Sequence, residues 1–199
     1  MTRLLLVRHG ETAWNAEGRL QGQAQVELSD RGLEQARALA PLVRSLGPAS
    51  AVSSDLRRAV QTVEALGFPD ARLDPGLREL GLGQWEGRTS AELQASEPEA
   101  YAAWRGGRSV PPGGESGEAL VARVQAALED ALRSPSPVLV VTHGGIVAAA
   151  IELLVGLDKR KLVPVGPASL TVLDVPDGET RLDGLGGAKL HSYNVTAPR

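Results

Sequence analysis

Two of the three histidines share one sequence context: each follows a short apolar run and directly precedes glycine. His9 comes after residues 4–7 and Arg8, and His143 comes after residues 138–142. Continuous apolar runs of this length are typical of parallel strands that are buried on both faces. Ligands of open α/β sheets bind beyond the carboxyl ends of the strands. If the two strands are neighbours, the two imidazoles therefore converge on one site.

Three interpretations of this pair remain open: two unrelated surface histidines, a metal site of two histidines and a carboxylate, or phosphoryl transfer through a nucleophilic imidazole. Metal ligation is disfavoured because Arg8 adjoins one candidate ligand, and no His-x-His or His-Glu-x-x-His spacing occurs. Phosphoryl transfer needs a neutral imidazole, cations around the transferred oxygens and a proton donor for the leaving group. Arg8 and the Arg57-Arg58 pair are suitable cations, since the planar guanidinium matches phosphate.

Composition excludes several other classes of function. With 24 acidic and 21 basic residues the net charge is -3, which argues against nucleic acid or an anionic membrane as partner. Because there is no cysteine, disulfides, Cys-ligated zinc, iron–sulfur clusters and a thiol nucleophile are excluded. No apolar run approaches the length of a membrane span or a signal segment, so we expect a cytoplasmic protein.

Short apolar runs alternate with helical patterns along the 199 residues, which predicts a single α/β domain with a sheet covered by helices. Ser29 and Asp55 are the predicted N-caps of helices over 30–46 and 56–66, with a kink or break at Pro41. The remaining predicted helices follow a capping box at 89–92, Pro98, Ser116 and His143. The predicted strands are 3–8, 49–53, 138–142 and 168–175, with a weaker strand after a turn at 176–178.

The motifs around these residues resemble, in order from residue 3 to about 155, those of the histidine phosphatase superfamily, also called phosphoglycerate-mutase-like. They are Arg8-His9-Gly10-Glu11-Thr12 with Asn15, and segments 18–22, 28–32, 35–36, 53–62, 77–79, 83–87, 113–116 and 141–145. A lone Arg-His-Gly would be weak, but the ordered set is specific. The resemblance implies a three-layer α/β/α fold with a mainly parallel central sheet and helices on both faces.

The resemblance also implies roles for individual residues. His9 matches the nucleophile that becomes phosphorylated, and Glu79 matches the general acid and base. The residues that match the phosphate pocket are Arg8, Asn15, Gln21, Arg58 and His143, of which Arg8, Arg58 and His143 also count as catalytic. No metal and no cofactor is required. Arg57 is expected to point elsewhere, and His191 is expected on a surface strand.

These roles set the proton states that catalysis requires. His9 must be neutral, with its second ring nitrogen donating to a fixed acceptor such as a backbone carbonyl. His143 is expected to be cationic beside a dianionic phosphate. Glu79 must be protonated when the leaving group departs, and can then deprotonate water.

The segment from about 88 to 114 is predicted to be a lid-like insertion. It is short and carries Glu92, Glu97 and Glu99, whereas the cofactor-dependent mutases of the family have a longer, basic insertion here. We therefore expect the phosphatase branch: a metal-independent phosphomonoester hydrolase with a phosphohistidine intermediate, acting on small phosphorylated metabolites. A phosphoglycerate mutase and a non-catalytic phospho-ligand-binding protein remain as alternatives. The substrate, its range and a homodimer are left open.

Overall fold

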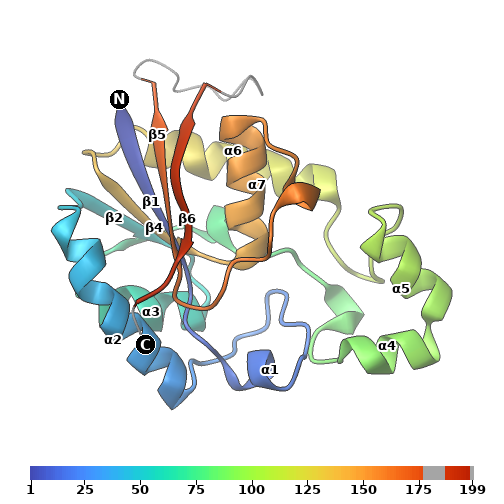
Figure 1. Ribbon diagram of the computed structural model, residues 1–199. Helices are drawn as coiled ribbons and strands as arrows, with labels where there is room; N and C mark the ends of the chain where they lie inside the picture. The colour runs from blue at the N-terminus through green and yellow to red at the C-terminus, as the bar shows by residue number, and fades with distance from the viewer. Residues whose placement is uncertain (177–186, 198–199) are drawn as a thin grey trace.

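A central sheet of six strands lies between two layers of helices in the computed structural model, which describes residues 1–176 and 187–197 (Figure 1). The strands are β1 (Thr2–Arg8), β2 (Ser50–Ser53), β3 (Arg72–Leu73), β4 (Val138–Thr142), β5 (Leu170–Val175) and β6 (Lys189–Val195), in the order β3-β2-β4-β1-β5-β6. β1, β2, β3 and β4 run parallel, and β5 is antiparallel to both of its neighbours. The predicted three-layer, mainly parallel fold is confirmed.

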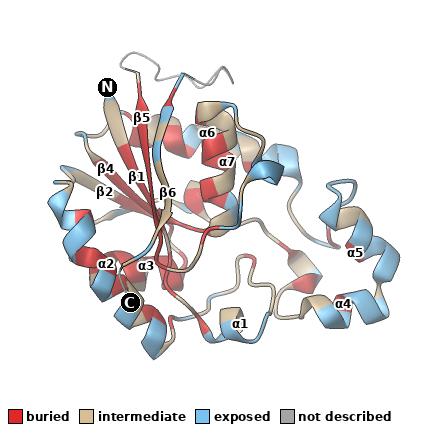
Figure 2. Ribbon diagram, in the orientation of Figure 1, coloured by how far each residue is buried: buried red, intermediate tan, exposed pale blue. Residues whose placement is uncertain are grey.

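Both faces of the sheet are apolar because each carries its own helical layer (Figure 2). Leu5 and Val7 of β1 face α2 (Asp30–Ser45) and α3 (Arg57–Leu66). Leu4 and Leu6 face the opposite way, toward α6 (Gly117–Ala131) and α7 (Gly144–Val155). Successive side chains of a strand point to opposite faces, so a strand with a helix on each side must be apolar throughout.

Most predicted helix ends match the structure. Ser29 caps α2 by accepting a hydrogen bond from the Gly32 backbone N–H at 3.1 Å, and α2 continues unbroken past Pro41. Gly67, in the left-handed conformation, ends α3. The predicted cap at Asp55 is wrong: α3 begins at Arg57 and has no side-chain cap.

Asp55 instead forms a two-pronged ion pair with Arg78. Its carboxylate accepts hydrogen bonds from Nε of Arg78 at 2.7 Å and from Nη2 at 2.5 Å. A bidentate guanidinium–carboxylate pair joins two opposite charges through two hydrogen bonds, whereas a cap would give the carboxylate bonds from uncharged N–H groups, so the carboxylate turns away from the helix. The Arg78 charge also lowers the pKa of Asp55 below its usual value, chiefly through this hydrogen bond.

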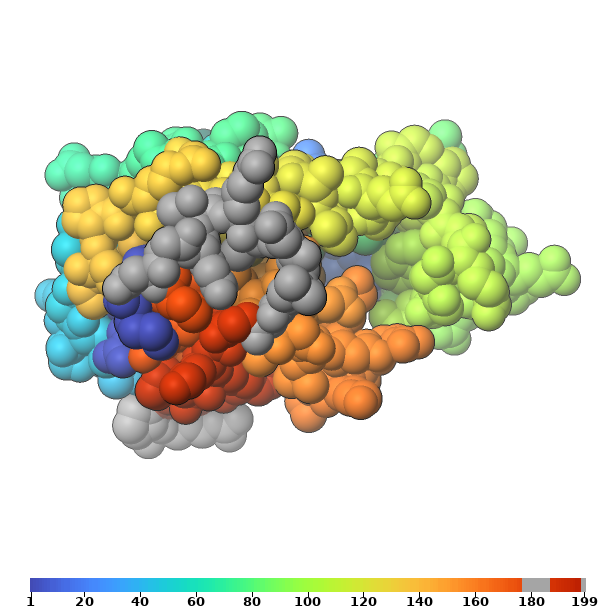
Figure 3. Space-filling model, turned by 90° about the horizontal axis from the view of Figure 1, so that it is seen from above, coloured from blue at the N-terminus to red at the C-terminus, as the bar shows by residue number. Residues whose placement is uncertain are grey.

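The segment of residues 82–105 contains α4 (Ser90–Ser96) and α5 (Pro98–Arg105) and packs around an apolar cluster of its own. We call this the lid cluster; its buried members are Leu82, Trp85, Leu93 and Tyr101. The predicted capping box is present, with Thr89 and Glu92 bonded reciprocally. Seen from above, α5 and its surroundings project sideways from the body of the molecule (Figure 3).

The remaining elements are short or lie at the sheet edge. They are α1 (Ala13–Ala16) and three single-turn 3₁₀ helices at Pro75–Leu77, Gly83–Trp85 and Lys159–Lys161. His191 lies exposed on β6, as predicted, 2.7 Å from the Asp174 carboxylate. Most of the predicted turn at 176–178 lies outside the described residues.

Close backbone contact between the loop after His9 and the first turn of α2 gives a test of the fold. A Cβ on Gly32 would lie 2.0 Å from the Glu11 carbonyl oxygen. Gly32→Ala is therefore expected to lower the free energy of unfolding by about 1–3 kcal/mol, the usual cost of overpacking. The control is Gly117→Ala at the start of α6, where a Cβ meets nothing within 4 Å. Chemical denaturation measures both, and equal stabilities would contradict the contact.

Candidate active site

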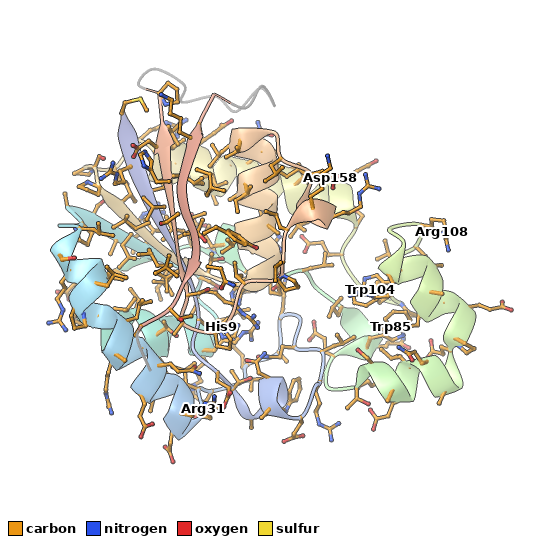
Figure 4. All side chains as sticks on the ribbon, viewed as in Figure 1. His9, Arg31, Trp85, Trp104, Arg108 and Asp158 are labelled. Atoms are coloured by element: carbon orange, nitrogen blue, oxygen red, sulfur yellow. The ribbon has the colours of Figure 1, made fainter. Side chains whose placement is uncertain are left out.

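The two predicted histidines meet at the carboxyl edge of the sheet. β1 and β4 pair in parallel with Arg8 opposite Thr142, so the residues that follow them are adjacent. The His9 backbone N–H donates to the Thr142 carbonyl at 2.9 Å, and the two imidazole centroids lie 5.2 Å apart. Both side chains are buried. Figure 4 shows His9 at this edge, with Trp85 and Trp104 of the lid cluster across from it.

Hydrogen bonding fixes which nitrogen of His9 is nucleophilic. Nδ1 lies 2.7 Å from the Gly10 carbonyl oxygen, which can only accept, so Nδ1 carries the proton. Burial, then the charges of Arg58 and Arg8, hold the pKa of His9 well below its usual value. The ring is therefore neutral near pH 7, and the Nε2 lone pair is available, as the sequence analysis required.

Thr62 connects this nucleophile to the helix that carries Arg58. Its Oγ1 accepts a hydrogen bond from the Gly10 backbone N–H at 3.1 Å and donates to the Arg58 carbonyl at 2.6 Å. Thr62 lies on α3 one turn after Arg58, so both project from the same side of the helix. The sequence analysis did not assign it a role, although this spacing was visible.

Two guanidinium groups supply positive charge, and their hydrogen bonds in the described part of the chain go to backbone carbonyls. The fully buried Arg58 donates to the carbonyls of Ala24 at 2.8 Å and Gly22 at 2.7 Å, and Arg8 donates to that of Val165. Burial lowers the pKa of Arg58 to about 10, which still leaves it charged at neutral pH, and burial also lowers the pKa of Arg8. Carbonyls orient these cations without neutralising them.

Within residues 1–176 and 187–197, four buried side-chain polar atoms lack a hydrogen-bond partner: Nε of Arg8, Nε of Arg58, Nδ1 of His143 and Oε1 of Gln21. All four belong to residues predicted to hold phosphate. Each such atom costs about 1–3 kcal/mol when left unpaired, so a cluster of them points to a missing ligand. Rotation of the Gln21 amide would present its NH₂ in place of the oxygen. The cluster then consists of donors and suits an anion.

His143 is the N-cap residue of α7, and its Nε2 lies 2.8 Å from Oγ of Ser54. Burial, followed by the charge of Arg58 and smaller contributions from His9, Arg8 and Arg123, holds the pKa of His143 well below its usual value. The ring of His143 is therefore neutral near pH 7 in this structure. The expectation of a cationic His143 was made for a dianionic phosphate beside the ring, and this pKa does not test it.

Glu79 reaches the same edge from the loop after the 3₁₀ helix at Pro75–Leu77. Its carboxylate accepts hydrogen bonds from the backbone N–H groups of Leu80 at 2.9 Å and Gly145 at 3.1 Å. Its charge raises the pKa of Arg8 and Arg58, opposing their burial. A Cβ on Gly145 would lie 2.4 Å from Oε1 of Glu79, so only glycine allows this approach to the start of α7.

Arg123 of α6 binds the backbone of the loop that carries Glu79. Its guanidinium donates to the carbonyls of Gly76 at 2.9 Å, Arg78 at 2.6 Å and Glu79 at 2.9 Å. The same group pairs with Glu115 through contacts of 2.6 and 2.8 Å. The sequence analysis missed Arg123, although a cation on the otherwise apolar face of the predicted helix was a visible signal.

Asn15 and Arg57 are the two remaining positions for which the sequence analysis gave an expectation. Asn15 lies on α1, where its Oδ1 accepts from the Thr12 backbone N–H at 3.1 Å; this leaves its amide NH₂ as the group that can donate to a ligand. Arg57 pairs with Glu27 on the surface at 2.7 Å and takes no part in the site, as predicted.

Other classes of site were also considered in the described residues. There, no cluster of three or more histidine, aspartate or glutamate side chains is arranged to hold a metal ion. The same part of the chain has no helix with the length and apolarity needed to cross a membrane.

Comparison with known proteins gives a consistent set of relatives. The family described as "Histidine phosphatase superfamily (branch 1)" matches residues 4–186. A glucosyl-3-phosphoglycerate phosphatase of Mycolicibacterium vanbaalenii is 41% identical over 217 residues, 98% of this chain and 95% of that protein. Phosphoglycerate mutase-like protein 4 of Arabidopsis thaliana is 36% identical over 186 residues, 88% of this chain and 80% of that protein. The structure of a mycobacterial glucosyl-3-phosphoglycerate phosphatase with VO3 has a TM-score of 0.85 at 34% identity, covering 98% of this chain and 99% of that one.

The Arg123 contacts predict a selective kinetic defect. Arg123→Met should displace Glu79 and lower turnover of an alkyl phosphate by about tenfold or more, which is a part of the roughly 10²–10⁴ that proton transfer contributes in full. The first-turnover release of nitrophenol from p-nitrophenyl phosphate, whose leaving group needs little protonation, should be slowed much less. Because the variant leaves Glu115 without its cation, Arg123→Met with Glu115→Gln is the control for stability. An equal loss of the first-turnover rate on both substrates would show that Arg123 does not act through Glu79.

Proposed function

The chain belongs to branch 1 of the histidine phosphatase superfamily and is a phosphatase of small phosphorylated metabolites, and we propose that it hydrolyses phosphate monoesters through a phosphohistidine at His9. The observation that carries this proposal is the set of four unpartnered buried polar atoms beside a neutral imidazole. These atoms mark a site for an anion beside the imidazole of His9, where the hydrogen bonds of the two arginines go to backbone carbonyls.

In the first step, the Nε2 lone pair of His9 attacks phosphorus and the bond from phosphorus to the ester oxygen breaks. Glu79, which takes up a proton from solvent when the negative charge of the phosphate lies beside it, gives that proton to the departing oxygen, which leaves as an alcohol. Arg8, Arg58 and His143 hold the three remaining phosphoryl oxygens, where charge is spread in the transition state. Donors that are already oriented by backbone carbonyls need no rearrangement as the reaction proceeds.

In the second step, water attacks the same phosphorus atom and the phosphorus–nitrogen bond breaks. Glu79, now a carboxylate, takes a proton from the water, and the lone pair returns to Nε2 of His9. The acid of one step thus becomes the base of the next. Inorganic phosphate leaves, and the enzyme is restored without a metal ion or a cofactor.

Hydrolysis is favoured over the two alternatives on specific grounds. A mutase must exclude water and retain its substrate for a second transfer, whereas the segment joining residues 88 and 114 is short and not basic. A protein that only bound phosphorylated ligands would not need a nucleophile with a fixed tautomer or a carboxylate held against α7. Glucosyl-3-phosphoglycerate, the substrate in the name of the Mycolicibacterium vanbaalenii relative, is the first substrate to test, with phosphoserine and 3-phosphoglycerate beside it.

Covalent trapping tests the nucleophile. Rapid quench of the wild type with phosphorus-labelled substrate, in excess EDTA, should give acid-labile, base-stable phosphate on the protein and release inorganic phosphate. His9→Ala should trap none and lose turnover, because both steps need Nε2. If His9→Ala turned over near the wild-type rate, the assignment would be wrong. Isomerisation of 3-phosphoglycerate with little phosphate released would instead indicate a mutase.

Replacement of Glu79 separates its two roles. Glu79→Gln keeps the shape of the side chain but has no transferable proton, so alkyl phosphate turnover should fall by about 10²–10⁴. With p-nitrophenyl phosphate the first step should survive while the second still lacks a base, so phosphohistidine should accumulate. Steady-state rates and trapped phosphate measure this. No accumulation and an equal loss on both substrates would argue against Glu79 as the proton carrier.

A further inference from the structure

Ser54 is the buried residue whose hydroxyl contacts His143, and it is not among the residues that the resemblance assigns to the site. It directly follows β2, and its backbone N–H donates to the Val141 carbonyl at 2.9 Å, which ties it to the neighbouring strand β4. Its Oγ lies 2.8 Å from Nε2 of His143, and both side chains are fully buried. The contact therefore has a fixed geometry and no competition from solvent.

The direction of this hydrogen bond follows from counting protons. Oγ of Ser54 accepts the Leu56 backbone N–H at 3.3 Å, and it owns one proton to donate. Among the described residues, Nε2 of His143 is the acceptor in contact with that hydroxyl. If Nε2 carried a proton instead, two donors would face each other or the hydroxyl proton would lose its acceptor, at a cost for buried groups.

We propose that Ser54 fixes the tautomer of His143, so that the ring stays neutral at Nε2 and presents an Nδ1–H donor to the phosphoryl group. The identity of the anion rests on the proposed function, but the tautomer does not. In this arrangement Nδ1, which has no partner among the described residues, is a donor that can bind an oxygen of the phosphoryl group. The opposite tautomer would aim a lone pair at the anion and repel it.

The two histidines of the site thus have hydrogen-bond partners of opposite kind, an acceptor at Nδ1 of His9 and a donor at Nε2 of His143. A carbonyl oxygen, which only accepts, holds Nδ1–H of His9 and leaves its Nε2 lone pair free to attack. A hydroxyl, which donates, occupies Nε2 of His143 and leaves its Nδ1–H free to bind. Two imidazoles in the same tautomer therefore act as nucleophile and donor, because their partners contact different ring atoms.

Nitrogen-15 spectroscopy tests the tautomer directly, since the chain has only three histidines. In long-range ¹H–¹⁵N spectra of the uniformly labelled protein, His143 should show a protonated Nδ1 and an unprotonated Nε2, with and without vanadate. Ser54→Ala should shift the His143 resonances toward the Nε2–H form. A protonated Nε2 in the wild type, free or bound to vanadate, would overturn the proposal.

A matched pair of variants separates this effect from general damage to the site. Ser53→Ala removes a neighbouring buried hydroxyl that donates to the Ser54 carbonyl at 2.9 Å and does not touch His143, so its His143 resonances should not move. Ser54→Ala should weaken inhibition by vanadate and by inorganic phosphate by about tenfold, the lower end for a hydrogen bond to a charged group. Equal resonances and equal inhibition in the two variants would refute the role of Ser54.

Substitution of His143 itself remains informative if Ser54→Ala fails to fold. The amide NH₂ of asparagine can occupy the place of Nδ1, whereas that of glutamine reaches the place of Nε2. His143→Asn should therefore retain more vanadate affinity than His143→Gln, and the reverse order would overturn the proposal. These binding and spectroscopic results do not depend on turnover, so failure of the proposed hydrolysis would be seen separately, as an absence of released phosphate.

Discussion

Two guanidinium groups at the edge of the sheet, that of Arg58 fully buried and that of Arg8 partly buried, have no direct contact with a carboxylate in the described residues. Much of the site follows from that constraint. A buried charge must be hydrogen-bonded, and a carboxylate partner would neutralise it. Arg58 instead donates to two carbonyls of the loop at residues 22–24, and Arg8 donates to Val165. Backbone dipoles orient the cations yet leave their charge for a ligand. The same hydrogen bonds connect the loop at residues 22–24 to α3 and residue 165 to β1.

The same charges set the chemistry of the neighbouring rings. Burial and positive potential together lower the pKa of His9 and His143, so that both imidazoles are neutral without any carboxylate attached to them. One electrostatic field thereby keeps both rings neutral, the state that the proposed nucleophile and the proposed donor each require. The negative charge of Glu79 acts in the opposite direction and stabilises the protonated arginines. Its carboxylate is held by the N–H groups of Leu80 and Gly145 rather than by an ion pair.

The sequence was most informative where local pattern and chemistry coincide. The buried strands β1 and β4, the Ser29 cap and the Gly67 stop are encoded by adjacent residues, and the ordered motifs identified the family. The errors came from contacts between residues distant in the chain. Asp55 pairs with Arg78, 23 positions away, instead of capping the helix that follows it. The two-residue strand β3 is defined by its pairing with β2. Ser54 and His143 are 89 positions apart, so no local pattern could reveal which ring nitrogen is occupied.

The lid cluster has a consequence for how this scaffold can change over evolution. Its buried members are drawn from residues 82–101 and include none of the side chains that line the two faces of the sheet. Substitutions among Trp85, Leu93 and Tyr101 therefore act first on that segment, while Leu80, which packs against both this cluster and one face of the sheet, connects it to the loop of Glu79. Much of the segment can thus vary in lineages that keep the packing beneath His9 and His143.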